Sequence, residues 1–333
     1  MKLYIVLPIY NIEVDNDVID TEIISGYKLI TNRTFFDVYK KEIIFNENTD
    51  VYRSLYEDIL IHQAGMPFTR TRAEYILIKE FKVEKEYDFD NKLFNSFMNE
   101  EKAKLNHFIL LLRLIQKGRC QVNSFYIFTR FSHAKGEIDF STNVEDIGSL
   151  LSSTDEIVHE NKYIVSIETI EKLNQASLIV QPFSKDILIP INYFMQYYRT
   201  NSMYDRIIKL AIVLESSVLA GIKEELNYRL KIRASNFLKK DYRKELDMFY
   251  KLRSCIVHNG TIDIKYFDSI RTIINDKQCS NSKALFIFIG DYMEHLVRDI
   301  LYKSFEIFAK SEIKNYNQLF SSVDNEILEK ITR

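Results

Sequence analysis

The sequence predicts an α+β protein, in which a mixed α/β domain that contains a sheet is followed by an all-α helical bundle. Three observations predict this class. Short β-branched and aromatic runs are concentrated in the first half of the 333 residues, and apolar residues at helical spacing dominate the last third. In addition, 8 Gly and 4 Pro leave little room for disordered linkers, and an apolar fraction of 46% suffices for buried cores.

The first half combines strand-like and helical patterns. Leu3, Ile5 and Leu7 alternate with their neighbours, which predicts a first strand over residues 1–10. Further strand-like runs cover 21–31, 74–83, 124–131 and 162–168. Between them, apolar residues at helical spacing predict a helix over 93–116 that ends at Gly118. We expect this domain to cover residues 1–190.

The second half becomes helical after a segment that contains Pro182 and Pro190, and we expect a helical domain over 200–333. Asn201 or Ser202 can cap a first helix that ends near Gly221. Apolar stripes predict further helices over 223–238, 241–258 and 282–310, with a short helix near 264–275.

Bulk properties narrow the class of protein. The net charge of −2 argues against wholesale electrostatic binding of nucleic acid, although a local basic face is compatible with it. Three widely spaced cysteines match neither a disulfide framework nor a paired-cysteine zinc site, so we expect a reducing, cytoplasmic location. No run of about 18 apolar residues is present, and we expect no membrane-spanning helix. No metal-binding or nucleotide-binding motif is recognised, and we expect no cofactor.

Charged residues interrupt three of the apolar stripes. These are Glu215, Arg233 and Arg253, one on each of the first three predicted helices of the second half. Burying one ionised group alone costs several kcal/mol, so we expect the three side chains to converge on one another or on a polar cleft. A structural ion-pair network explains Glu215 and Arg233 equally well.

The third of these helices carries the residues with the clearest chemistry. Arg253 and His258 are five positions apart near its end, and Asn259–Gly260 is typical of a helix terminus. His258 would stand in the last turn, where the helix dipole favours an imidazolium and proton transfer becomes accessible. Ser254 lies one turn before His258 on the same face, and Tyr250 one turn earlier. A histidine that merely complements the dipole is the alternative.

The charge distribution adds a second indication. Between residues 228 and 253 there are nine Lys or Arg against three acids, a net charge of +6. Such a segment suits a phosphodiester ligand, and we take Lys239, Lys240, Arg243 and Lys251 as candidate RNA-binding residues. A solvated helical hairpin with internal ion pairs would have the same composition.

The order of three blocks resembles the HEPN domain, and in particular the Apea-like HEPN group of bacterial defence and toxin systems. The blocks are 211–219 with Glu215, 228–238 with Arg233, and 249–260 with the Arg-x4-His pattern of Arg253 and His258. The resemblance covers about residues 200–310. Ser254 departs from the pattern, since many active relatives carry Asn, Asp or His there.

This resemblance implies a metal-independent endoribonuclease in antiphage defence or toxin systems. It implies a homodimer through the helical domain, in which two Arg/His pairs form one cleft for RNA. Arg253 would orient the scissile phosphate and His258 would transfer protons around attack by the 2′-hydroxyl, with Ser254, Glu215, Arg233, Tyr250 and Asn259 in support. The first domain would act as a sensor or in substrate selection, and a regulatory partner or a phage-derived trigger would control the enzyme. The alternative is a catalytically inactive HEPN module that serves as a dimerisation or RNA-binding scaffold.

Overall fold

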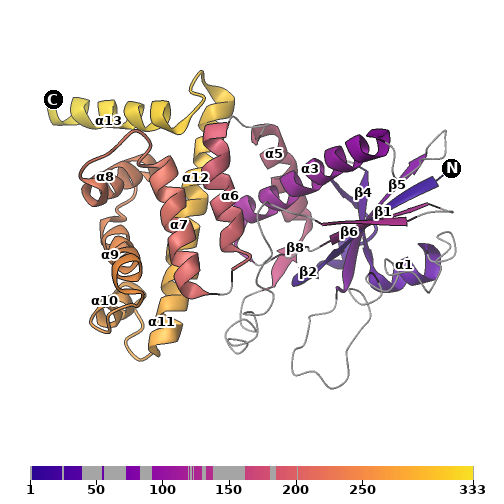
Figure 1. Ribbon diagram of the computed structural model, residues 1–333, viewed down its shortest axis with the longest axis horizontal. Helices are drawn as coiled ribbons and strands as arrows, with labels where there is room; N and C mark the ends of the chain where they lie inside the picture. Colours follow the sequence, from indigo (N-terminus) through magenta and orange to yellow (C-terminus); the bar gives the residue numbers. More distant parts are fainter. Residues whose placement is uncertain are drawn as a thin grey trace. The chain divides into compact units, whose positions relative to one another are not determined.

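The computed structural model describes residues 2–24, 26–39, 55, 73–82, 92–118, 120, 122, 124–129, 133–137, 162–180, 185–200 and 202–332. The chain divides into two compact units, Met1–Ala176 and Ser177–Arg333. The first is built around a sheet and the second is helical (Figure 1), so the predicted α+β class is confirmed. The division lies before the 190–200 boundary expected from the prolines.

The main sheet of the first unit has six strands in the order β3-β4-β5-β1-β6-β7, and each neighbouring pair is antiparallel. Its strands are β1 (Lys2–Ile9), β3 (Glu22–Ile24), β4 (Tyr27–Thr31), β5 (Tyr75–Lys82), β6 (Ser124–Thr129) and β7 (His133–Glu137). Two short strands, β2 (Ile12–Val14) and β8 (Tyr163–Val165), pair in parallel as a second sheet. A short 3-10 helix covers Asn16–Val18.

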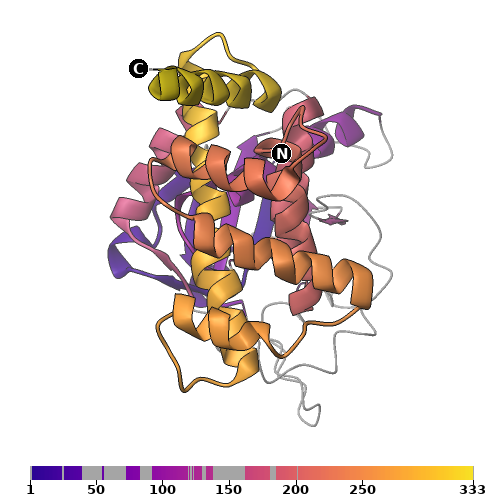
Figure 2. The same ribbon diagram turned by 90° about the vertical axis from the view of Figure 1, so that its left-hand side faces the viewer.

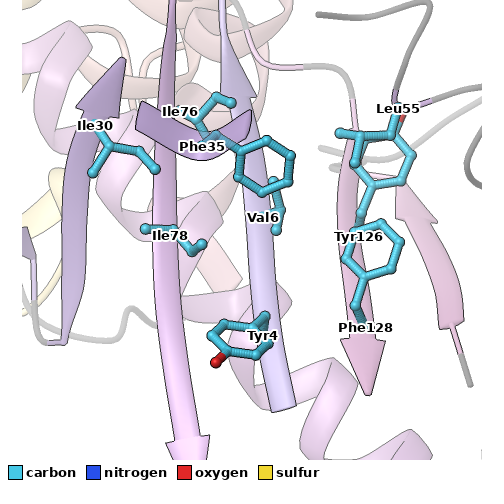
Figure 3. Close-up of a cluster of buried hydrophobic side chains, with 9 residues drawn as sticks. All are labelled: Tyr4, Val6, Ile30, Phe35, Leu55, Ile76, Ile78, Tyr126 and Phe128. Carbon is cyan, nitrogen blue, oxygen red and sulfur yellow. The ribbon is translucent and has the colours of Figure 1, made fainter. Parts of the chain in front are cut away.

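Apolar residues cover both faces of the main sheet, because successive residues of its central strands point to opposite faces and are apolar. One face carries the cluster in Figure 3, where Phe35 of α1 (Asn32–Val38) lies over the strands. The cluster consists of Tyr4, Val6, Ile30, Phe35, Leu55, Ile76, Ile78, Tyr126 and Phe128. On the other face, Leu29 and Leu77 line a small apolar cavity with Phe108 and Leu112 of α3 (Lys92–Ile115). The sheet is therefore covered on both sides.

The second unit is a bundle around α7 and α12 (Figures 1 and 2). Its helices are α6 (Lys185–Tyr197), α7 (Met203–Ser217), α8 (Leu226–Leu238), α9 (Arg243–Asn259), α10 (Tyr266–Ile273), α11 (Asn281–Ile287), α12 (Glu294–Lys310) and α13 (Tyr316–Thr332). Helices α6, α9 and α12 pack against α7, and α8 packs against α9, α12 and α13. A π-helical turn, Phe288–Met293, joins α11 to α12, so the helix expected over 282–310 is continuous but contains one wider turn.

Several boundaries differ from the sequence prediction, each for a local reason. The segment 181–202 was expected to be a connection, but α6 contains Pro190 and buries Ile187, Ile191 and Phe194. These apolar residues have helical spacing, and their burial stabilises the helix by more than the loss of the one backbone hydrogen bond that proline cannot make. Helix α5 (Ile167–Ile179) begins inside the run 162–168 that was expected to be a strand, because the strand stops at Val165.

Candidate functional site

The C-terminal end of α9 is formed as the sequence indicates. Leu246, Phe249 and Leu252 are buried and anchor the helix in the bundle. Gly260 ends the helix with a left-handed φ of 69°, and its N–H donates to the carbonyl of Ile256 at 3.0 Å. Glycine adopts this conformation without the steric cost that a Cβ would add. His258 consequently lies in the last turn, as predicted.

Arg253 forms an ion pair across the bundle. Its Nη2 lies 3.2 Å from Oε1 of Glu215 on α7, and both side chains are 28% exposed. This Glu215 oxygen is buried and accepts no hydrogen bond from a described residue, so its contact with Arg253 is electrostatic. The guanidinium also lies 5.8 Å from the centre of the Tyr250 ring. Arg253 is therefore partly accessible and held on two sides.

Tyr250 completes this small cluster. Burial raises the pKa of its hydroxyl, the Glu215 carboxylate raises it further, and Arg253 opposes both effects. The hydroxyl therefore stays protonated at neutral pH and can donate a hydrogen bond. Three of the predicted site residues, Glu215, Tyr250 and Arg253, are thus brought together by α7 and α9.

His258 belongs to a different part of the surface. It is exposed, as are its neighbours Val257 and Asn259, while Ser254 is half-buried. Five residues of α-helix correspond to about 500°, so Arg253 and His258 project about 140° apart and about 7.5 Å apart along the axis. Within one chain the two side chains do not share a face of α9.

Arg233 does not join the cluster, and the expected convergence of three charges is wrong for this residue. Its guanidinium is buried and makes a bidentate pair with Asp324 of α13, with Nε–Oδ1 and Nη2–Oδ2 distances of 3.0 and 2.6 Å. Nη1 donates to the carbonyls of Val218 and Ala220 at 2.8 and 3.3 Å. Its partner was missed because α13 was not predicted as a helix.

The candidate RNA-binding residues fall into two groups. Arg243 is chelated by Asp241, with contacts of 2.8 and 2.7 Å, and Lys251 pairs with Asp247 at 2.7 Å. Lys239 and Lys240 are exposed and form no ion pair with the residues that the structure describes. Asp241 and Asp247 lie in the same basic segment, two and four residues from the cations with which they pair. This short spacing of opposite charges could have predicted that Arg243 and Lys251 are neutralised.

A buried polar cluster outside the proposed site was also missed. Glu294, at the start of α12, accepts hydrogen bonds from the Tyr198 hydroxyl and from Nη2 of Arg298, the latter at 3.1 Å. Burial raises the pKa of Tyr198, and the nearby Glu294 carboxylate raises it further. The cluster follows directly after the π-helical turn and joins the end of α6 to α12.

Comparison with known proteins identifies no relative: no family model matches the chain, and no curated protein or solved structure shows significant similarity to it. In the described part of the chain, no three His, Cys, Asp or Glu side chains are grouped as metal ligands would be. The described helices also include none with the length and hydropathy that crossing a bilayer requires.

Proposed function

We propose that the chain is a cytoplasmic, metal-independent endoribonuclease of the HEPN type. The observation that carries the proposal is the combination of a partly accessible Arg253 and an exposed His258 within the last two turns of α9. A guanidinium and an imidazole are two groups that can support phosphodiester cleavage by a 2′-hydroxyl. One neutralises the developing phosphate charge, and the other moves protons.

Arg253 would act on the scissile phosphate. A phosphate can compete with Glu215 for the guanidinium, because the Arg253 side chain is 28% exposed and its contact with the buried Glu215 Oε1 lacks hydrogen-bond geometry. The planar guanidinium can donate two parallel hydrogen bonds to phosphate oxygens, which orients the phosphorus for in-line attack. The Tyr250 ring lies 5.8 Å from the guanidinium and would help to position it, and its hydroxyl remains protonated.

His258 would act in proton transfer. His258 is exposed in the last turn of α9, and an imidazole nitrogen can either accept or donate a proton. One protonation state can accept the 2′-hydroxyl proton and the other can protonate the leaving 5′-oxygen. Proton transfer of this kind contributes about 10²–10⁴-fold to the rate.

Two copies of the chain would complete the cleft. Arg253 and His258 project in different directions from one α9, so a single chain presents them to different volumes of solvent. A homodimer through the helical unit can bring the arginine of one protomer beside the histidine of the other. RNA in this cleft, and a regulatory partner or phage-derived trigger sensed by the first unit, are the partners that we propose.

Digestion of RNA in the presence of a chelator tests this proposal. The wild type should release fragments, and both Arg253→Ala and His258→Ala should lose at least about 100-fold in rate, the lower range for general acid–base catalysis. His295→Gln is the matched control, because His295 is an exposed histidine of the same unit that lies outside the proposed cleft. Undiminished cleavage by folded His258→Ala would refute the assignment.

The second candidate function is a catalytically inactive scaffold that dimerises or binds RNA, and the Glu215–Arg253 ion pair favours it. If that pair serves only to hold α7 to α9, Glu215→Gln should loosen the bundle and create no activity. If the chain is a nuclease, Glu215→Gln frees Arg253 to bind the phosphate, and the variant should still cleave RNA at a measurable rate. A chain that binds RNA but never cleaves it, in any variant, would identify the scaffold.

A further inference from the structure

The basic segment of α8 and α9 is neutralised unevenly. Asp247 pairs with both Lys231 and Lys251, at 3.0 and 2.7 Å, and Asp241 holds Arg243. At the turn between the helices, Lys239 and Lys240 have no ion-pair partner within the described ranges. Positive charge therefore accumulates at this turn, which is the end of α9 opposite to His258.

A third lysine reaches the same turn from a different helix. Lys303 of α12 donates to the carbonyl of Phe237, in the last turn of α8, and its Nζ lies 4.8 Å from the centre of the Phe237 ring. Burial lowers the pKa of Lys303, and the charge of Lys239 lowers it further, while Glu306 and Glu326 oppose this. The contact with Phe237 places the Lys303 ammonium against the backbone two residues before Lys239. We call Lys239, Lys240 and Lys303 the turn cluster.

The backbone at Lys239 closes α8 and presents the lysine side chain at the turn. Lys239 occupies the left-handed region, with φ 54° and ψ 37°, at the position after α8 where glycine is usual. A residue with a Cβ pays a steric cost there. The N–H groups of Lys239 and Lys240 donate to the carbonyls of Asn236 and Ser235, at 3.2 and 3.1 Å, so this backbone ends the helix and leaves both lysine side chains exposed.

The exposed face of α9 continues from the turn cluster to His258. Lys244, Lys251 and His258 are spaced by seven residues, which returns each to the same face of a helix within about 20°. All three are exposed. Asp247 lies one turn from Lys251 on this side and is the acid that partly offsets the row.

We infer that the turn cluster binds phosphates of a single-stranded RNA whose backbone follows Lys244 and Lys251 along α9 to His258. This inference rests on the proposed function and adds a substrate class to it. Lys244 and His258 are about 21 Å apart along the helix axis, at about 1.5 Å per residue. A stacked strand rises about 3.4 Å per nucleotide, so the row spans about six nucleotides.

The substrate is therefore a single-stranded segment longer than about six nucleotides, in which the turn cluster holds phosphates remote from the cut. Phosphate contacts of this kind supply affinity and no sequence preference. A single-stranded DNA of equal length should occupy the same row and inhibit RNA cleavage without being cut, because it lacks the 2′-hydroxyl.

Binding of a labelled 12-nucleotide RNA and a 3-nucleotide RNA to His258→Ala protein tests the inference separately from catalysis. Lys239→Gly removes the charge at a position where glycine is the favoured residue, so the fold should be retained. It should weaken binding of the 12-mer about eight-fold at about 50 mM salt, which is one phosphate contact at a salt slope of about 0.7. Lys303→Gln should do the same, and the 3-mer, which is too short to span the row, should bind every variant more weakly than the 12-mer.

Arg229→Gln is the matched control, because Arg229 is an exposed cation of α8 that pairs with Glu225 at the far end of the helix. It should leave binding of the 12-mer unchanged. Equal 12-mer affinity for Lys239→Gly and its parent would overturn the inference even if the enzyme cleaves RNA. Weakened binding by Lys239→Gly in a chain that never cleaves RNA would support the phosphate row and refute the nuclease. Absence of any 12-mer binding at low salt would overturn the inference.

Discussion

At the residue scale, two arginines of similar sequence context have different environments. Arg233 is 3% exposed at its side chain and satisfies its donors with Asp324 and two carbonyls. Arg253 is 28% exposed, pairs with Glu215 and lies near the Tyr250 ring. A buried, fully bonded guanidinium has no capacity left for a substrate, whereas a half-solvated one can exchange its partner. The structure thus separates a structural arginine from a candidate catalytic one.

This difference predicts two unequal stability effects. Arg233→Met leaves Asp324 and the carbonyls of Val218 and Ala220 without a donor, and it should lower the free energy of unfolding of the helical unit by about 3 kcal/mol. Glu215→Gln removes only a partly solvated pair and should cost less than about 1 kcal/mol. Hydrogen exchange of the α7 and α8 amides measures both values. Equal protection in the two variants would contradict this assignment of roles.

Asp247 predicts a pH dependence of the α8–α9 hairpin. Burial alone would raise its pKa, but hydrogen bonds from Lys251, Lys231 and Asn227 outweigh that effect and lower the pKa to about 2. Because the folded-state pKa lies below the unfolded value of about 3.9, this carboxylate stabilises the fold above about pH 4. That contribution is lost as the pH falls from about 4 to about 2.

Asp247→Asn should therefore remove part of the acid sensitivity of this hairpin, while reducing its stability at pH 7. Exchange protection of α8 and α9 amides, followed from pH 7 to pH 2, measures the effect. Asp205→Asn, an exposed first-turn carboxylate of α7, is a suitable control outside the hairpin. An identical acid profile for Asp247→Asn and wild type would show that the lysine contacts carry no stability.

At the element scale, the sequence predicts an element well where a periodic stripe and a terminal residue agree. The helix ended by Gly260 and the helix capped by Ser202 are both confirmed, because glycine and serine satisfy backbone groups locally. The start of α8 was expected at Lys223, but it follows Glu225 in a left-handed conformation that is uncommon for glutamate.

Long-range partners explain the elements and site contacts that were missed. Helix α13 was not predicted, and Arg233 was assigned to the wrong partner for that reason. Lys303 lies 66 residues from the Phe237 carbonyl that it contacts, so no local pattern could have joined it to Lys239. By contrast, the expected convergence of charges is confirmed for Glu215 and Arg253, because both interrupt apolar stripes of helices that pack together.

The N-terminal cap of α7 offers a direct test at this scale. The Ser202 side chain accepts a hydrogen bond from the Asp205 N–H at 3.3 Å. Ser202→Ala should lower the stability of the helical unit by about 1 kcal/mol, and Ser202→Asp should restore it, because aspartate caps equally well and complements the dipole. Exchange of the first-turn amides of α7 reports the effect. Wild-type protection in Ser202→Ala would contradict the role of the cap.

At the scale of the whole molecule, the fold class and the presence of a helical second unit follow from sequence periodicity. The position of the division between the two units does not follow from sequence periodicity, because the sequence of α6 contains proline and resembles a connection. Only its packing against α7 shows that it is a helix of the second unit. The candidate site lies entirely within the helical unit, on α7 and α9. The proposed activity therefore depends on that unit and a second copy of it.

The most direct test of the central claim is cleavage of a 12-nucleotide RNA, in chelator, beside a copy with one 2′-deoxyribose at the mapped cut site. If Arg253 and His258 cleave by 2′-hydroxyl attack, the all-ribose strand yields a 2′,3′-cyclic phosphate end and the modified strand stays intact at that position. Cleavage of the modified strand at the deoxyribose, or wild-type rates from His258→Ala on the ribose strand, would contradict the account.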